Sequence, residues 1–267
     1  KVYNKKIYMS YIKEINDCQY LNISVADLNF QTLKFNNFHS FKECGNFIQA
    51  GRIVSYKHNG IDGLLFSTSN QIPDDTDKNL HPPQDDESIF GKILFFDLET
   101  KEYIIFSKGH RNIQGLYTEG DLILSTEHGP KGGDEINRIK FKENYGWPLA
   151  SYGEKYSSYN SKTYYKKNHI SQGFQEPIFA YVPSIAISEI IRLPNEFSEN
   201  FQNNFIITTL AQRHIHRVKF DKNFEKLIFD EKILIDERIR DIVYIKKNNL
   251  ILMAFEEKGE IGLLSKK

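Results

Sequence analysis

The apolar residues of this chain lie in short runs, each rich in β-branched and aromatic side chains and bounded by Gly, Asn, Asp or Pro. Runs of this kind predict β-strands. The clearest are KIYMSYI, GLLFSTS, KILFFDL, EYIIFS, DLILSTE, NFIITTL and NLILMAF. A helical period of apolar positions is nearly absent. We therefore expect an all-β fold, which leaves a sandwich, a barrel or a propeller.

Four of the predicted strands look like copies of one another: LLFST from Leu64, LILST from Leu122, FIITT from Phe205 and LILMA from Leu250. They start 58, 83 and 45 residues apart, and the longest interval contains a polar, Tyr-rich insertion over 151–175. Propeller blades repeat every 40 to 50 residues or so, and loop insertions lengthen the repeat. The repeat therefore favours a propeller. Because each copy ends in small polar residues before a loop, we expect it to be an inner strand that lines a central channel.

Composition narrows the range of partners. Among 267 residues, 35 Lys and Arg balance 35 Asp and Glu, so no general attraction to nucleic acid or to an acidic membrane surface follows. No apolar run approaches the roughly 18 residues of a membrane helix. The first residues, KVYNKKIYMSYI, are strand-like rather than a signal peptide. We expect residue 1 to fall inside a fold and the chain to be part of a longer protein.

Cys18 and Cys44 are the only cysteines, so neither a Cys-x-x-Cys metal site nor a disulfide framework can be inferred. Either a single disulfide or two buried free thiols fits this pair. We expect the free thiols.

Candidate chemistry gathers in GHRNIQGLYTEGDLILSTEHGPKGGDEIN, residues 109–137. The guanidinium of Arg111 can bind a carboxylate through two N–H groups, and Asn112 can hydrogen-bond beside it. Farther along, ERIRD places Arg238 and Arg240 two residues apart, so that both side chains point the same way from a strand. Both arginines can therefore face one carboxylated ligand.

A purely structural interpretation stands beside this one. Arginines near strand ends are usually solvated or paired with a neighbouring acid, here Asp241 or Glu237, and Gly-Gly-Asp is usually only a turn.

The segments GHRNIQGL, EHGPKGGDEIN and NYGWPLASYG resemble the signature of the soluble pyrroloquinoline-quinone-dependent sugar dehydrogenases. This is the glucose/sorbosone dehydrogenase family, and the resemblance is strongest to its aldose sugar dehydrogenase branch. Weaker similarity in AGRIV, PQDDESIFGKIL, QEPIFAYVPSIAISEI and ERIRDIVY extends it over nearly the whole chain. The resemblance implies a single β-propeller domain over 1–267 of the six-bladed type. It also implies that the N-terminal blade and part of the next are missing, so that about four and a half blades are present.

The resemblance further implies two cofactors, pyrroloquinoline quinone (PQQ) and Ca²⁺, with a small sugar as substrate. PQQ is a flat tricarboxylate with a quinone edge, so its site needs cations, a metal and a base. Family positions that contact the cofactor match Arg111, Asn112, His128, Asp134, Arg238 and Arg240. The backbone carbonyls matching Gly129 and Pro130 bind the cofactor's calcium, and the positions matching Glu135 and Tyr145 form a second, structural calcium site.

Two family residues are absent. The catalytic His, which takes the proton of the sugar's C1 hydroxyl, falls at Ile48 by direct count, or at Phe47 if the loop is one residue longer. Neither side chain can accept a proton, and this loss removes a contribution of about 10²- to 10⁴-fold to the rate. A cofactor-binding Lys falls at Ala211, where Arg213 is a partial replacement two residues on.

The other histidines are weak candidates for a catalytic base or a metal site. His39 and His58 lie a strand's length from the site, and we expect both on the surface. His214 and His216 can share a strand face, but the sequence shows no third zinc ligand.

Two hypotheses therefore remain, with a third beside them. The chain is either an aldose dehydrogenase that takes its base from elsewhere, or a degenerate propeller that binds a sugar, the quinone or a protein partner without turnover. The third is an incomplete ring that associates through exposed sheet edges. The resemblance implies a periplasmic or secreted protein. It specifies neither the sugar nor the electron acceptor.

Overall fold

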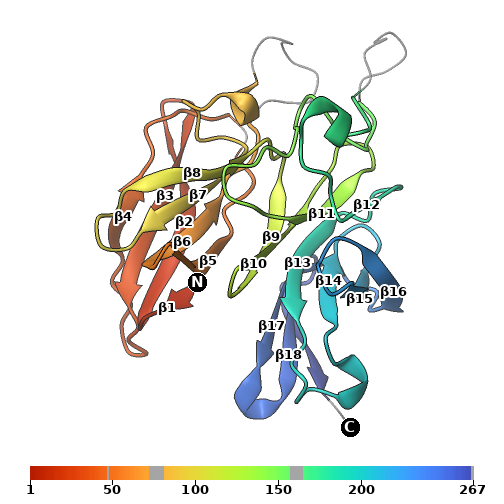
Figure 1. The fold of residues 1–267 in the computed structure, drawn as a ribbon. Helices are drawn as coiled ribbons and strands as arrows, with labels where there is room; N and C mark the ends of the chain where they lie inside the picture. Colours follow the sequence, from red (N-terminus) through yellow and green to blue (C-terminus); the bar gives the residue numbers. More distant parts are fainter. Residues whose placement is uncertain (47, 72–80, 157–164, 266–267) are drawn as a thin grey trace.

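The computed structural model describes residues 1–46, 48–71, 81–156 and 165–265. Five antiparallel sheets follow one another along the chain (Figure 1). The first contains β1 (Val2–Tyr3), β2 (Lys6–Ile15), β3 (Cys18–Asp27) and β4 (Asn36–Ser40). The second contains β5 (Ile53–His58), β6 (Ile61–Ser67), β7 (Lys92–Asp97) and β8 (Tyr103–Lys108). The third contains β9 (Ile113–Glu119), β10 (Leu122–Glu127), β11 (Asp134–Arg138) and β12 (Phe179–Tyr181).

The fourth sheet contains β13 (Ile187–Arg192), β14 (Phe205–Thr209), β15 (His214–Phe220) and β16 (Leu227–Leu234). The fifth contains β17 (Ile239–Ile245), β18 (Leu250–Phe255) and β19 (Glu260–Ser265). Four short 3₁₀ helices lie in the connections: η1 (Pro82–Gln84), η2 (Ile170–Gln172), η3 (Glu199–Phe201) and η4 (Lys246–Asn248). None of the helices in the described part of the chain has the length and apolarity that a bilayer crossing requires.

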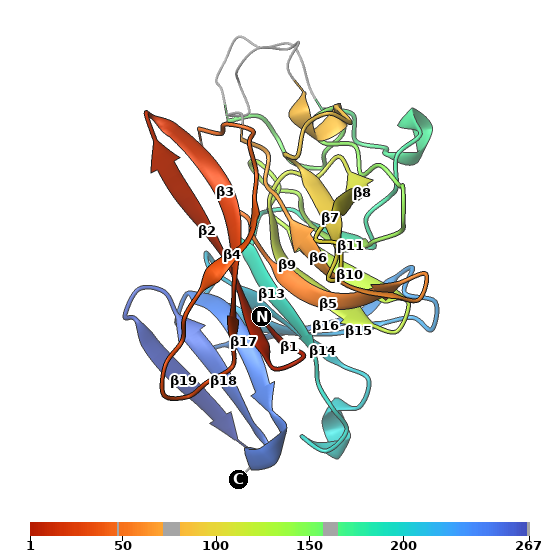
Figure 2. The ribbon, with the colours of Figure 1, turned by 90° about the vertical axis from the view of Figure 1, so that its left-hand side faces the viewer.

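The inner strands of neighbouring sheets contact each other in order: β2 with β5, β5 with β9, β9 with β13, and β13 with β17. Sheets arranged in this way around a common axis form a β-propeller, as the repeat predicts. The described residues contain five blades, the last with three strands, in place of the expected four and a half. Figure 2 shows the long β2–β3 hairpin of the first blade from the side.

The repeated runs are the second strand of each sheet, β6, β10, β14 and β18, so the expectation that they line the channel is wrong. Leu64, Leu65 and Phe66 show the reason, because all three are fully buried. Leu64 and Phe66 pack against the first blade, and Leu65 packs against the third. A strand between two neighbouring blades is apolar on both faces, and this gives the continuous apolar runs of the sequence.

The small hydroxyl residues that end these runs tie neighbouring strands together rather than lining a channel. Thr126 donates its hydroxyl to the carbonyl of Ser188 in the next blade. Thr209 donates to the carbonyl of His214 over 2.9 Å. Each hydroxyl thereby satisfies a buried backbone group close to the axis.

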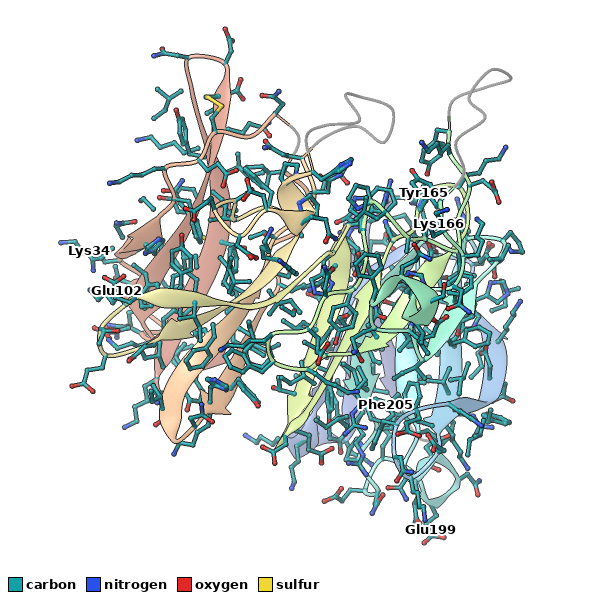
Figure 3. All side chains as sticks on the ribbon, turned by 45° about the horizontal axis from the view of Figure 1, so that its top comes forward. Lys34, Glu102, Tyr165, Lys166, Glu199 and Phe205 are labelled. Carbon is teal, nitrogen blue, oxygen red and sulfur yellow. A yellow bond between two sulfur atoms is a disulfide. The ribbon has the colours of Figure 1, made fainter. Side chains whose placement is uncertain are left out.

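Cys18 and Cys44 form a disulfide with their Cα atoms 5.4 Å apart, so the expectation of free thiols is wrong. The bond, drawn in yellow in Figure 3, ties the β2–β3 hairpin to the segment that follows β4. The sequence could not decide this, because the two cysteines are brought together only by the strand pairing and the return of the chain to Gly45, whose backbone pairs with Gln19.

The insertion expected over 151–175 lies partly outside the described residues. Its described parts lie against the third blade, where Glu154 pairs with Lys131 and Lys166 pairs with Ala150. Exposed apolar side chains occur on the first and the last blade, for example Ile12 on β2 and Leu263 on β19. Whether such edges associate with other chains stays a prediction.

Candidate functional site

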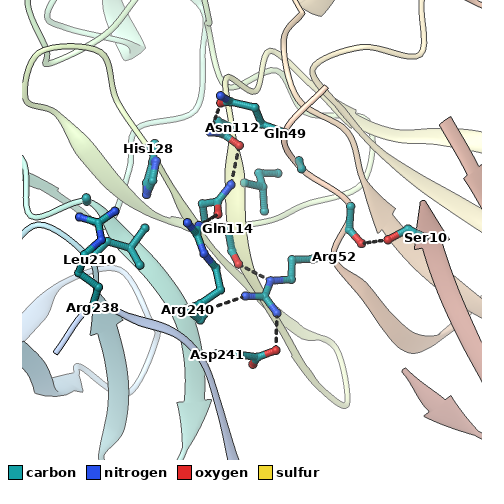
Figure 4. A pocket seen from close by; sticks show the side chains of 14 residues that line it. Ser10, Gln49, Arg52, Asn112, Gln114, His128, Leu210, Arg238, Arg240 and Asp241 are labelled. Carbon is teal, nitrogen blue, oxygen red and sulfur yellow. Dashed lines mark hydrogen bonds and ion pairs between the residues drawn. The ribbon is translucent and has the colours of Figure 1, made fainter. Parts of the chain in front are cut away.

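A cavity of about 630 Å³ lies on the axis, at the ends of the inner strands (Figure 4). Every described blade supplies part of its wall: Ser10, the segment 49–52, Asn112, Ile113, Gln114, His128, Ala186, Leu210, Arg238, Arg240 and Asp241. Strands that converge on an axis bring residues from distant parts of the sequence together, which is why ligand sites collect there. Four of the six predicted cofactor residues line this cavity: Asn112, His128, Arg238 and Arg240.

The arginine pair shares one internal carboxylate. Arg240 Nη2 lies 2.7 Å from Glu256 Oε1, and Arg238 Nη2 lies 3.2 Å from Glu256 Oε2. The structural interpretation of these arginines is therefore correct in part, but their partner is Glu256 rather than Asp241 or Glu237. The carboxylate of a ligand would bind to the same two guanidinium groups in the way that the Glu256 carboxylate does.

Arg111 lies behind the cavity wall rather than in it. Its Nη1 donates to the carbonyl of His128 over 3.1 Å, and its guanidinium lies over the ring of Trp147, 5.3 Å from the centroid. Burial lowers the pKa of His128, and the charges of Arg111 and Arg240 lower it further, while Asp134 opposes them. Both arginines therefore act on the same imidazole from two different blades, and Arg111 and Arg240 lie on the same side of the molecule.

Asp134 is a structural residue in this fold. Its Oδ2 accepts hydrogen bonds from Ser184 Oγ at 2.7 Å and from the backbone N–H groups of Ile185 and Ile187 at 2.9 and 3.2 Å. Its Oδ1 accepts from the N–H of Gly129 at 3.1 Å. The carboxylate thus fixes the Gly129 turn to the connection before β13, and it does not line the cavity.

The predicted metal residues surround a second, much smaller cavity. Gly129, Glu135 and Tyr145 border it, together with Glu127. Pro130 is not among its lining residues, and its carbonyl accepts a hydrogen bond from Tyr156 at 3.1 Å. Three of the four predicted metal residues are therefore brought together.

The chemistry of this small cavity fits a hard cation. Glu127 and Glu135 are paired across β10 and β11 and are both buried. Burial raises the pKa of Glu135 well above its ordinary value, and the charge of Glu127 raises it further. Carboxylate oxygens are ligands that Ca²⁺ prefers. The guanidinium of Arg111 borders the same cavity, and Glu127 is already engaged by His110 Nδ1 at 3.1 Å, so Glu135 is the carboxylate that would bind the ion. Within the described ranges, no three His, Cys, Asp or Glu side chains converge, so any further ligands would be backbone oxygens or water.

The position predicted for the catalytic His is not in the cavity. Ile48 is buried in the core between the first two blades, where it packs with Phe90 and Leu94. The alternative position, Phe47, lies outside the described residues. The residue of this segment that reaches the cavity is Gln49, whose amide cannot act as a base.

The other residues considered as replacements lie elsewhere. His39 and His58 are partly buried among aromatic rings, so the expectation of surface positions is only partly correct. Arg213 pairs with Glu257 and does not line the cavity. His216 Nδ1 pairs with Asp230 over 2.8 Å.

A cluster on the axis is the main feature that sequence reasoning missed. Arg52, just before β5, donates to the backbone carbonyl of Gln114 on β9 and, over 2.9 Å, to that of Arg240 on β17. Its Nη1 also lies 2.8 Å from Glu189 Oε2 on β13 and 3.0 Å from Asp241 Oδ2 on β17. One guanidinium therefore joins four blades at the floor of the cavity.

Burial raises the pKa of Glu189 to about 7, although Arg52 opposes this shift. Its carboxylate also accepts hydrogen bonds from the N–H groups of Leu116 and Ile190. The signal in the sequence is the charged residue in ISEII, because an acid inside an otherwise buried strand needs a partner.

The sequence profile of the family described as Glucose / Sorbosone dehydrogenase matches residues 2–263. The chain belongs to the glucose/sorbosone dehydrogenase family. Among relatives of this family, Aldose sugar dehydrogenase YliI of Escherichia coli is 33% identical over 161 residues, which are 59% of this chain and 42% of that protein. Quinoprotein glucose dehydrogenase B of Acinetobacter calcoaceticus is 44% identical over 63 residues, 21% of this chain and 13% of that protein. These matches span less than half the length of the relatives.

Solved structures agree with the fold. The apo form of the soluble aldose sugar dehydrogenase from Escherichia coli superposes with a TM-score of 0.81 at 22% identity, covering 98% of this chain and 79% of that one. The PQQ-bound aldose sugar dehydrogenase from Streptomyces coelicolor superposes with a TM-score of 0.69 at 18% identity, covering 98% and 75%. The glucose/sorbosone dehydrogenase resemblance of the sequence is thereby confirmed, and these structures support the propeller.

Proposed function

We propose that this chain belongs to a PQQ-dependent aldose dehydrogenase, which binds PQQ in the axial cavity and oxidises the anomeric carbon of a sugar to a lactone. The observation that carries the proposal is the meeting of Arg238, Arg240, Asn112 and His128 on one cavity. The printed names of relatives agree, since they include an aldose sugar dehydrogenase, a quinoprotein glucose dehydrogenase and a PQQ-bound structure.

Each residue has a role that follows from its chemistry. Arg238 and Arg240 bind ligand carboxylates, and Glu256 orients both guanidinium groups until the ligand arrives. Asn112, which also lines the cavity, hydrogen-bonds to the ring system. Arg111 does not touch the cavity, and we propose that it positions His128 through that residue's carbonyl. Arg52 holds the backbone of Gln114 and Arg240 in register beneath the ligand. PQQ, when bound, supplies the two-electron acceptor for the sugar.

We propose a Ca²⁺ site at the small cavity. Glu135 and the carbonyl of Tyr145 would hold this structural ion, and the carbonyls of Gly129 and Pro130 would hold a second Ca²⁺ that binds with the cofactor. The carbonyl of Pro130 already accepts a hydrogen bond from Tyr156, and its second lone pair is the one that would face the ion.

A second candidate function rests on Ile48. Its burial in the core leaves the cavity without a base at the family position, which favours a relative that binds its ligand without turnover. We also propose, from the family alone, a periplasmic or secreted location, a complete ring of six blades and an electron acceptor outside this chain.

One experiment separates the two functions. The protein is titrated with PQQ in the presence of CaCl₂, binding is followed by the fluorescence of Trp147, the single tryptophan, and glucose is then added. Binding followed by reduction of the cofactor supports the dehydrogenase. Binding without reduction by any aldose supports the second candidate. If PQQ does not bind, the dehydrogenase is wrong, and the second candidate is left only as a protein that binds a ligand other than the quinone.

A further inference from the structure

Four polar side chains form a continuous hydrogen-bonded row along the wall of the axial cavity (Figure 4). Arg240 Nη1 lies 3.0 Å from Gln114 Oε1, and Gln114 Nε2 lies 2.7 Å from Asn112 Oδ1. Asn112 Nδ2 in turn lies 2.9 Å from Gln49 Oε1. We call these residues, Arg240, Gln114, Asn112 and Gln49, the amide row.

The direction of every hydrogen bond in the amide row follows from its first member. A guanidinium has only N–H donors, so the atom of Gln114 that faces Arg240 must be its oxygen. The Gln114 amide then presents its NH₂ to Asn112, which must accept with its own oxygen and pass its NH₂ to Gln49. Turning any one amide over would bring two donors or two acceptors together. Since Asn112 and Gln114 are only 6% and 7% exposed, water could not compensate for that mismatch.

The end of the amide row is consequently fixed as well. Gln49 accepts with Oε1, so its Nε2 is the atom left over, and this nitrogen has no hydrogen-bond partner within the described residues. Gln49 is exposed and lines the cavity. The row therefore presents N–H donors to the cavity at both ends, Arg240 and Gln49.

The remaining polar groups of the wall add few acceptors, apart from His128, whose Nε2 has no hydrogen-bond partner within the described residues. Ser10 Oγ donates to the carbonyl of Gly51 over 2.8 Å. The Asp241 carboxylate already accepts from Arg52 at 3.0 Å and from the N–H of Ile242 at 2.8 Å. A wall of this kind selects for ligands whose oxygens accept hydrogen bonds.

We infer that Gln49 is a ligand-binding residue, which donates its amide N–H to a carboxylate or carbonyl oxygen of the molecule in the axial cavity. This inference rests on the proposed function for the identity of that molecule, but the polarity of the amide row does not depend on it. It also explains the segment around Ile48, which delivers a fixed donor to the cavity instead of a base.

The ligand contact is tested with Gln49→Glu and Gln49→Leu, using PQQ as the probe in the presence of CaCl₂. The carboxylate introduced by Gln49→Glu would still accept from Asn112, so the amide row stays intact, but the donor that faces the cavity is lost. We expect Gln49→Glu to weaken PQQ binding by about tenfold or more and Gln49→Leu by a smaller factor. Gln172→Glu is the matched control, because Gln172 is exposed and, among the described residues, its side chain bonds to Ser171 alone. Unchanged affinity in Gln49→Glu would overturn the inference.

The polarity is tested without any ligand, by the exchange of side-chain amide protons with water in ¹⁵N-labelled protein. We expect slow exchange for Asn112 and Gln114 and fast exchange for Gln49. Slow exchange at Gln49 with fast exchange at Gln114 would mean that the row runs the other way, and the inference would be wrong. If the unchanged protein fails to bind PQQ, the proposed function is wrong, whereas the exchange pattern still decides the polarity.

Discussion

Replacing Arg52 by Met tests the axial cluster most sharply, because a single guanidinium there serves four blades. The change removes two hydrogen bonds to backbone carbonyls, those of Gln114 and Arg240, at a cost of about 1 kcal/mol each whatever the pH. It also removes the partner of Glu189. Breaking one side of a buried ion pair costs about 3 to 5 kcal/mol, and we take the lower figure because the Arg52 side chain is 23% exposed.

The ion-pair part of this cost depends on pH. Burial raises the pKa of Glu189 from 4.5 to about 7, so the carboxyl is mostly protonated at pH 5 and mostly ionised at pH 8. Because the folded state holds this proton more tightly than the unfolded state, stability falls as the pH rises from about 4.5 to 7. We expect Arg52→Met to lower the free energy of unfolding by about 2 kcal/mol at pH 5 and by about 5 kcal/mol at pH 8.

The assay is urea unfolding followed by the fluorescence of Trp147, which is 4% exposed in the folded protein. The double variant Arg52→Met, Glu189→Gln is the control, and it should lose the difference between the two pH values. An equal cost of Arg52→Met at pH 5 and pH 8 would refute the reasoning, because the ion pair would then contribute nothing.

Three further predictions concern the frame around the site. Replacing Cys18 and Cys44 together by Ser should cost about 3 kcal/mol of unfolding free energy, because the bond closes a separation of 26 residues, and a reductant should then have no further effect. Gly115→Ala should lower the melting temperature and cost at least about 2 kcal/mol, since its Cβ would lie 2.7 Å from the carbonyl oxygen of Ser188 on β13, and an unchanged melting temperature would contradict the close approach of the inner strands β9 and β13. Burial lowers the pKa of Lys92 to about 8, so the unfolded state binds more protons than the folded state between about pH 8 and 10.5. Over that range the unchanged protein should therefore gain up to about 3 kcal/mol of unfolding free energy relative to Lys92→Met. Parallel curves of stability against pH for the two proteins would contradict this.

The fold could be predicted because a strand that is buried on both faces has apolar residues at consecutive positions. LLFST, LILST and FIITT are apolar at consecutive positions, and the structure places each between two blades. Their place within the blade could not be predicted, because an apolar run carries no information on distance from the axis. The inner strands are less regular in sequence, since one face meets the polar axis; ISEIIR is an example.

The site could be predicted only where the chemistry is local. Arg238 and Arg240 share a face because they are two residues apart, and in the structure both line the cavity and pair with Glu256. Arg52 and Glu189 could not be predicted because their partners come from other blades. Glu256 could not be predicted because its partners, Arg238 and Arg240, meet it only through the pairing of β17 with β18. Asp134 is the opposite case, because a motif marks it as a cofactor-site acid while its hydrogen bonds to Ser184 and the backbone of Ile185 give it a structural role as well. Its contact with a cofactor stays a prediction.

The central claim is that guanidinium groups from separate blades converge on one axial cavity that holds a carboxylated quinone. A crystal structure of the protein grown with PQQ and CaCl₂ tests it most directly. The account predicts PQQ in the cavity, with its carboxylates against Arg238 and Arg240 and with Asn112 and Gln49 donating to its oxygens. PQQ bound elsewhere on the molecule, or an axial cavity that stays empty at saturating PQQ, would contradict it.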